Sequence, residues 1–138
     1  MSDKKKATCL APSAIVAVCR TCFAAIHPRC PAAGHAQLIS EGIAFVAPRD
    51  EGAPKLIDQC RSRYPWFDRK ISTHIPASVR EQARLLKRAK GFRSFQELYL
   101  EAMLASLVVR GFLTVGLEAV AGDAGLAREP AEGRRRAA

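Results

Sequence analysis

Residues 95–109 constrain the fold most, because they predict a helix whose surface is apolar on nearly every side. Leu98, Ala102 and Val109 lie on one face of this helix, and Met103 and Leu107 lie on much of the other. Such a helix has to be covered on several sides, and a unit of roughly 40 residues cannot cover it alone. The sequence therefore predicts that a second copy of the chain supplies the missing layer.

A strand is predicted at residues 69–75, where apolar and polar side chains alternate. Ile71, Thr73 and Ile75 lie on one face, and Pro76 ends the strand. The backbone groups of a single short strand need hydrogen-bond partners from another strand. That strand comes either from the N-terminal half of this chain or from a second copy.

A basic helix is predicted at residues 79–90, and Gly91 predicts its end. Ser94 and Glu97 form a capping-box pattern that opens the second helix. Between residues 69 and 110 there are nine Lys or Arg and three acidic residues, so this part carries +6 of the chain's net charge of +9. The concentration of charge predicts a polyanionic partner, and nucleic acid is favoured over a membrane surface.

The order of strand, proline, basic helix, turn and apolar helix resembles the ribbon-helix-helix DNA-binding proteins of the Arc/MetJ class. The resemblance implies an α+β homodimer in which two strands pair antiparallel and enter the major groove of double-stranded DNA. The base-reading residues that it implies are Lys70, Ser72 and His74. Ser94 and Phe95 would supply backbone donors to phosphate, and the predicted DNA-binding set also includes Arg69 and Arg93.

This chain departs from that class because its strand lies in mid-chain and because Thr73 is a weak core residue. An alternative interpretation therefore stays open. The strand could belong to an internal sheet, with the basic stripe as a solvated helix face.

The five cysteines all lie in the first 60 residues, and their odd number favours reduced thiols or metal ligands over a disulfide framework. The spacing C-x2-C-x4-H-x2-C-x4-H predicts a zinc site. Ordinary reduced cysteines and a redox C-x-x-C pair are the alternatives. The predicted ligands are Cys19, Cys22, His27 and Cys30, with His35 at the end of the pattern and Cys60 as a substitute.

Three regions are predicted along the chain. Residues 1–54 form a Cys/His-bearing N-terminal segment of uncertain fold that ends in a Pro- and Gly-containing linker at 48–54. Residues 55–121 form the ribbon-helix-helix DNA-binding and dimerisation region. Residues 122–138 form a flexible tail with almost nothing to bury. No internal repeat is visible.

Some local predictions are less constrained. Residues 1–8 read as a polar, lysine-rich arm, and residues 37–39 and 43–46 read as two short strands around a turn. Residues 112–121 predict a short further helix. The aromatic cluster at 64–67 is expected to pack and seal the junction between the two halves.

The sequence thus predicts a sequence-specific double-stranded DNA-binding protein, either a transcriptional repressor or an accessory factor of plasmid maintenance or transfer. The alternative is a zinc-dependent protein-interaction or RNA-binding module that dimerises through its helices. An enzyme is not expected, because no paired carboxylates, phosphate-cradling glycine loop or nucleophile with a defined base is present. No apolar run reaches the roughly 18 residues of a membrane span, and we expect a cytoplasmic protein.

Overall fold

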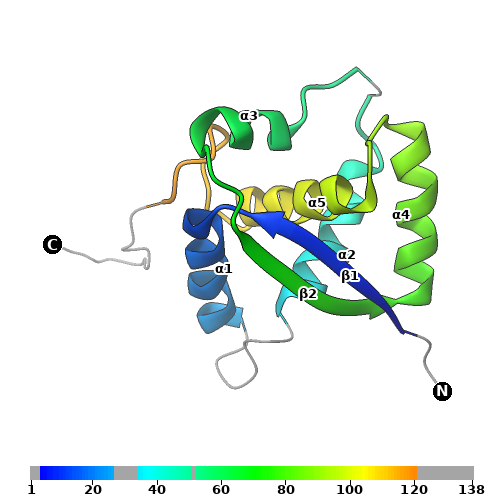
Figure 1. Cartoon of the computed structure of the whole chain (residues 1–138), viewed down its shortest axis with the longest axis horizontal. Coiled ribbons are helices and arrows are strands. Elements are labelled where there is room, and N and C mark those ends of the chain that lie inside the picture. The colour runs from blue at the N-terminus through cyan, green and yellow to red at the C-terminus, as the bar shows by residue number, and fades with distance from the viewer. Residues whose placement is uncertain (1–3, 27–33, 51, 121–138) are drawn as a thin grey trace, which may run out of the picture.

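The fold is α+β, with a two-stranded antiparallel sheet in front of the helices in the view of Figure 1. The computed structural model describes residues 4–26, 34–50 and 52–120. None of the helices in this part has the length and apolar character that crossing a bilayer requires. In chain order the elements are β1 (Lys4–Ala11), α1 (Ser13–Ile26), α2 (Gly34–Val46), α3 (Leu56–Arg63), β2 (Arg69–Pro76), α4 (Ala77–Ala89) and α5 (Phe95–Val109).

The predicted strand is confirmed as β2, and its partner comes from the N-terminal half of the same chain. β1 runs antiparallel to β2 from the pair Lys4↔Pro76 to the pair Ala11↔Arg69. The prediction of a polar arm at residues 1–8 was wrong for most of that segment. Its alternation was hidden because the inward residues of β1 are small, and Ala7 and Cys9 do not stand out as a strand pattern.

α2 corrects a second prediction, because residues 37–39 and 43–46 are helical and not two strands. The buried residues of α2 recur with helical spacing at Leu38, Ile39, Gly42, Ile43 and Val46. That period of 3.6 residues places them on one face, and α2 packs this face against α5. Short apolar runs fit a strand or a buried helix equally well until the longer period is considered.

α5 is confirmed as a helix that is covered on several sides, and one chain supplies the cover. Every side chain from Leu98 to Leu107 is buried, and α5 contacts α2, β1, α3 and α4. Ser106, the buried polar residue near its end, donates a hydrogen bond from Oγ to the Leu38 carbonyl at 2.6 Å. A second copy is therefore not needed to cover this helix.

A single hydrophobic core contains residues from both sides of the predicted boundary at 54/55. The predicted linker lies in the connection between α2 and α3. Beyond α5 the predicted helix at 112–121 was wrong, because this segment turns back through an isolated antiparallel bridge between Leu113 and Ala119. The predicted tail at 122–138 lies outside the described residues.

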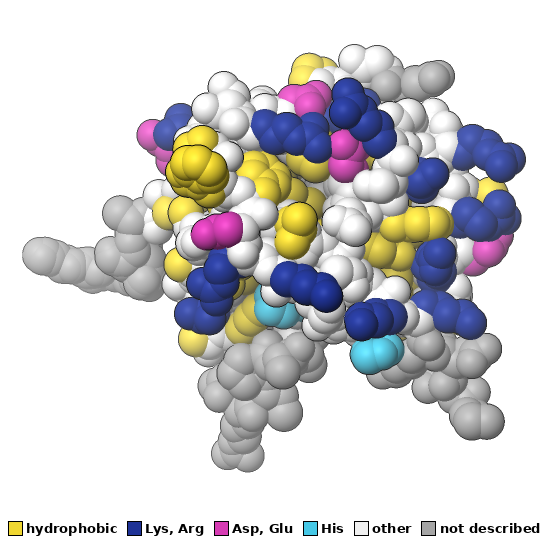
Figure 2. Space-filling model, viewed as in Figure 1, with side chains coloured by type: hydrophobic (Ala, Val, Ile, Leu, Met, Phe, Trp, Pro, Cys, Tyr) yellow, Lys and Arg dark blue, Asp and Glu magenta, His cyan; other side chains and the backbone are white. Residues whose placement is uncertain are grey.

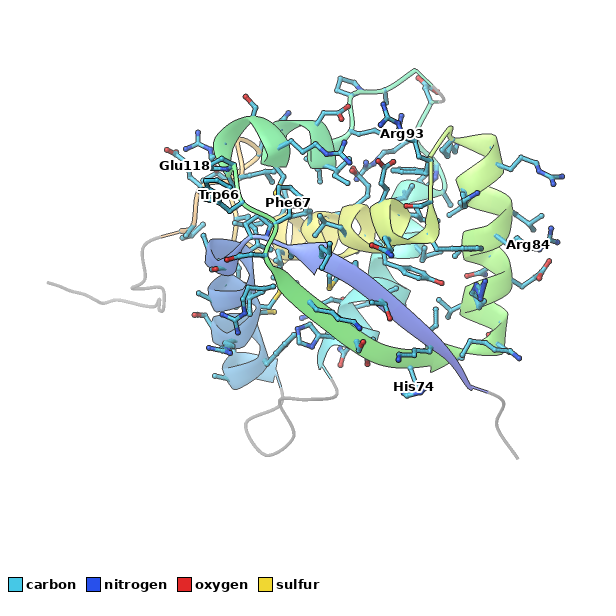
Figure 3. All side chains as sticks on the ribbon, viewed as in Figure 1. Trp66, Phe67, His74, Arg84, Arg93 and Glu118 are labelled. Carbon is cyan, nitrogen blue, oxygen red and sulfur yellow. The ribbon has the colours of Figure 1, made fainter. Side chains whose placement is uncertain are left out.

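The aromatic cluster packs only in part. Tyr64 donates a hydrogen bond from its hydroxyl to the Leu117 carbonyl at 2.8 Å, and Phe67 packs partly buried against the core. Trp66 is 76 % exposed and corrects the prediction that it seals the junction. Figure 3 labels Trp66 and Phe67 in the segment between α3 and β2.

The element order contains the unit β-α-α twice, as β1-α1-α2 and as β2-α4-α5. α1 and α4 lie at opposite ends of the strand pair in Figure 1. α2 of the first unit packs on α5 of the second. The chain therefore carries a structural repeat that the sequence analysis missed.

Candidate nucleic-acid interface

The candidate interface is the outward face of the β1/β2 pair, which we call the ribbon face. Its six residues stand in three cross-strand pairs, and directly opposite residues share one face of a sheet. The other face carries Ala7, Cys9, Ile71 and Ile75, all of which are buried in the core. The pairs of the ribbon face are Lys6↔His74, Thr8↔Ser72 and Leu10↔Lys70.

The predicted base-reading residues Lys70, Ser72 and His74 are brought together on this face, and all three are exposed. Ser72 lies opposite Thr8, and their hydroxyl oxygens are 3.3 Å apart. Figure 3 shows His74 at the edge of β2, outside the helices. Arg69, at the start of β2, is exposed, but it pairs with Ala11 and so lies at the end of the other face.

Sequence analysis missed the half of the ribbon face that β1 contributes, namely Lys6, Thr8 and Leu10. A signal for it exists in the sequence. Pro12 follows Lys6 by the same number of residues as Pro76 follows Lys70, and each proline immediately precedes a helix.

The N-terminus of α5 lies near Leu10 of this face, since Leu10, Ser94, Gln96 and Glu97 line one hollow, and it is capped as predicted. Ser94 is the N-cap, and its Oγ accepts a hydrogen bond from the Glu97 backbone N–H at 3.2 Å. The N–H groups of Phe95 and Gln96 in the first helical turn have no partner within the helix, and N–H groups at helix starts are common anion-binding groups.

Glu97 places a carboxylate at the same helix end. It accepts hydrogen bonds from the Arg61 guanidinium at 2.7 Å and from the Arg93 backbone N–H at 3.1 Å. Burial raises the pKa of Glu97, but these hydrogen bonds and the two nearby cations outweigh burial and lower the pKa overall. The Glu97 carboxylate is therefore ionised at neutral pH and would repel a phosphate at this helix end. Arg93 and the helix N–H groups would have to offset that repulsion for a phosphate to bind.

The Phe95 side chain has a role that the sequence did not predict. The Arg80 guanidinium lies 4.0 Å from the centroid of its ring, and the Lys87 ammonium lies 5.6 Å from it. Tyr99 stacks on the same ring at 5.9 Å. These cation–π contacts hold two cations of α4 next to the start of α5.

The basic side chains gather around the ribbon face and α4. Figure 2 shows the molecule from this side, with dark blue Lys and Arg side chains along the strand pair and over α4. Arg84 points outward from α4 in Figure 3, and Arg93 lies near the start of α5. The basic helix predicted from the sequence thus lies beside the ribbon, since α4 contacts both strands.

The predicted zinc ligands are only partly within the described structure. Cys19 and Cys22 are fully buried in the core, and burial raises their thiol pKa values to about 12 and about 11. His27 and Cys30 lie outside the described residues. Within the described ranges, no three His, Cys, Asp or Glu side chains are grouped to hold a metal ion. Zinc binding stays a prediction that metal analysis of the purified protein tests.

Comparison with protein-family models, with curated proteins and with solved structures gives no match to this chain.

Proposed function

We propose that this chain is a sequence-specific double-stranded DNA-binding protein that inserts the ribbon face into the major groove. The proposal rests on one observation: two paired strands turn Lys6, Thr8, Lys70, Ser72 and His74 outward on one face and bury Ala7, Cys9, Ile71 and Ile75 on the other. The major groove is wide enough for a two-stranded ribbon of this kind. Repression of transcription, or assistance in plasmid maintenance or transfer, is the biological role that we propose for such binding.

The chemistry of the ribbon face suits base edges. A Lys ammonium donates to the O6 and N7 acceptors of guanine, and Ser or Thr hydroxyls both donate and accept. Lys6, Lys70, Thr8 and Ser72 therefore supply recognition groups from both strands. The cations of α4 and Arg93 supply charge for the flanking phosphates, which fix the position of a protein on the duplex without reading its sequence.

Binding to DNA selected from a random library tests the proposal. Fluorescence anisotropy should show that the triple variant Lys70→Ala, Ser72→Ala, His74→Ala binds the selected site at least tenfold more weakly than the unaltered chain does, because each lost base contact costs about 1–3 kcal/mol. The variant should keep its circular dichroism spectrum, since all three side chains are exposed.

The matched control is Gln59→Ala with Ser62→Ala, two exposed polar residues on α3. It should leave affinity unchanged. Equal affinity of the triple variant and the control would remove the ribbon face from the recognition role.

A further inference from the structure

We propose that one chain occupies one DNA site and that the site consists of two unlike half-sites, one read by β1 and the other by β2. This inference rests on the proposed function and adds the form of the target to it. It follows from an approximate twofold relation between the two β-α-α units, together with the positions at which the units differ.

The first sign of the twofold relation is in the strands. The spacing from Lys6 to Pro12 equals the spacing from Lys70 to Pro76, so Thr8 and Ser72 fall at equivalent positions. Thr8 and Ser72 also lie directly opposite each other in the antiparallel pair. Equivalent residues meet only where a twofold axis passes, so the axis crosses the ribbon at this pair.

The second sign is in the packed helices α2 and α5. Leu38, Glu41 and Gly42 of α2 have the same spacing as Leu98, Glu101 and Ala102 of α5. Gly42 lies so close to the Ala102 backbone that a Cβ atom at Gly42 would be 1.8 Å from the Ala102 carbonyl oxygen. Equivalent positions therefore meet again at the helix crossing.

The third sign is a pair of matching ion pairs. The Arg49 guanidinium, beyond the end of α2, binds Glu101 of α5 at 2.5 Å. The Arg110 guanidinium, at the end of α5, binds Glu41 of α2 at 2.6 Å. Each second helix thus holds an arginine from just beyond the end of the other.

A twofold ribbon presents the same register to both sides of a DNA dyad, which is why dimeric proteins bind palindromic operators. Here the two strands belong to one chain and are free to differ. The lysine is the same in both strands, as Lys6 and Lys70, and the hydroxyl is retained as Thr8 and Ser72. The third outward position differs, because Leu10 stands where β2 has His74.

This difference predicts the form of the site. Leu10 has no hydrogen-bonding group and suits the methyl group of thymine, whereas the His74 imidazole donates or accepts at a base edge. The two half-sites should share the base pair next to each lysine. They should differ at the base pair that Leu10 reads in one half and His74 reads in the other.

Selection of DNA from a random library, combined with native mass spectrometry of the complex, tests the inference. We expect a non-palindromic motif bound by one chain. The variant Leu10→His makes the outward positions of the strands alike, and its selected site should become palindromic at the differing base pair. Leu10 is 46 % exposed, so the variant should fold. His74→Leu, at an exposed position, makes the opposite symmetric ribbon and serves if Leu10→His does not fold.

At the base pair that Leu10 reads, replacing the preferred base pair by the one that His74 prefers should weaken binding of the unaltered chain roughly tenfold. The same replacement should strengthen binding of Leu10→His by a similar factor. A palindromic site for the unaltered chain, or two chains on one site, would overturn the inference while leaving the proposed function intact. A folded chain that selects no DNA at all would overturn both the proposed function and this inference. Full affinity of the Lys70, Ser72 and His74 triple variant would show that the ribbon face does not read DNA, and it would therefore also overturn both.

Discussion

The two β-α-α units have the same element order but use their first helices differently. In α4 only Ala83 is fully buried, and the helix carries four cations and one acidic residue. α1 carries one charged residue, Arg20. The buried residues of α1 include Ile15, Val16, Val18, Cys19, Cys22 and Phe23.

This contrast indicates that the first helices of the two units contribute different properties to the molecule. α1 contributes apolar area to the core, and burial of that area favours folding. α4 contributes charge, and it packs on the core through the buried Ala83 and the partly buried Val79 and Leu86. A repeat within one chain permits this division, whereas two identical subunits would have to carry the same charge and the same apolar area.

The helix crossing is where the units are most tightly joined, and Gly42→Ala should have the largest effect on stability. The added Cβ would overlap the carbonyl oxygen, carbonyl carbon and Cα of Ala102. Backbone atoms cannot rotate away as a side chain can, so α2 and α5 have to separate. We expect a loss of most of the stability of a small domain, on the order of 5 kcal/mol, measured by urea unfolding.

Gly52→Ala is the matched control, because no heavy atom lies within 4 Å of a Cβ built at Gly52. It should change the free energy of unfolding by less than about 1 kcal/mol. If Gly42→Ala behaves like Gly52→Ala, then α2 and α5 do not cross at Gly42.

The matching ion pairs should differ strongly in their effect on stability. Glu101 is fully buried and also accepts hydrogen bonds from the backbone N–H groups of Leu56 and Ile57 at 2.8 and 2.9 Å. Glu101→Gln leaves the Arg49 charge without its carboxylate and should cost about 3 kcal/mol. Glu41 is 31 % exposed, so Glu41→Gln should cost about 1 kcal/mol or less.

Urea unfolding of the two variants under the same conditions gives the comparison. Equal losses would show that burial does not distinguish the two ion pairs.

The C-terminal unit was predictable from sequence because its alternation, proline stop, capping box and basic face are all strong local signals. Strand β2 and helices α4 and α5 were found for this reason, with the three base-reading candidates of β2. In the N-terminal unit these local signals are weaker. Ala7 and Cys9 are too small to mark the inward face of β1. The apolar residues of α2 also fit two short strands when the period is judged over only a few consecutive residues.

The repeat was missed for a related reason. The strands and first helices match at one spacing, but the second helices match at a spacing four residues shorter, because the first unit has more residues between its strand and its second helix. Lys6 and Lys70 are identical across the units, yet most equivalent positions differ. The pairing of β1 with β2 shows which positions are equivalent, because it sets Thr8 opposite Ser72. Strand register depends on the whole fold, and local composition does not encode it.

The charge difference between α1 and α4 predicts unequal dependence of DNA binding on salt. Each phosphate contact adds about 0.9 to the slope of log affinity against log salt concentration. Arg84→Gln with Arg88→Gln should therefore reduce the slope by up to about 1.8, and Arg20→Gln should reduce it by at most about 0.9. Anisotropy titrations at several salt concentrations measure both. A larger reduction for Arg20→Gln would place the stronger phosphate contacts on the N-terminal unit.

The smallest predicted effect concerns the start of the second helices, where His35 of α2 is equivalent to Phe95 of α5. The His35 ring packs edge-on against Phe23 at 4.6 Å, and its Nε2 is buried without a hydrogen-bond partner among the described residues. Burial and, to a lesser extent, the nearby Arg20 lower the pKa of His35 below its ordinary value of 6.5. The unfolded chain therefore takes up a proton more readily than the folded chain does as the pH falls.

The titration of His35 therefore costs no stability above about pH 6.5, and it destabilises the fold increasingly as the pH falls toward the lower pKa of the folded state. His35→Phe copies the residue of the other unit and removes both the titration and the unpartnered nitrogen. Urea unfolding should show a gain of about 1 kcal/mol at pH 7.5 and a larger gain at pH 5.5. His74→Gln, at an exposed position, is the control and should leave the His35 contribution unchanged. An equal gain from His35→Phe at both pH values would mean that the imidazole titrates alike in the folded and unfolded chains.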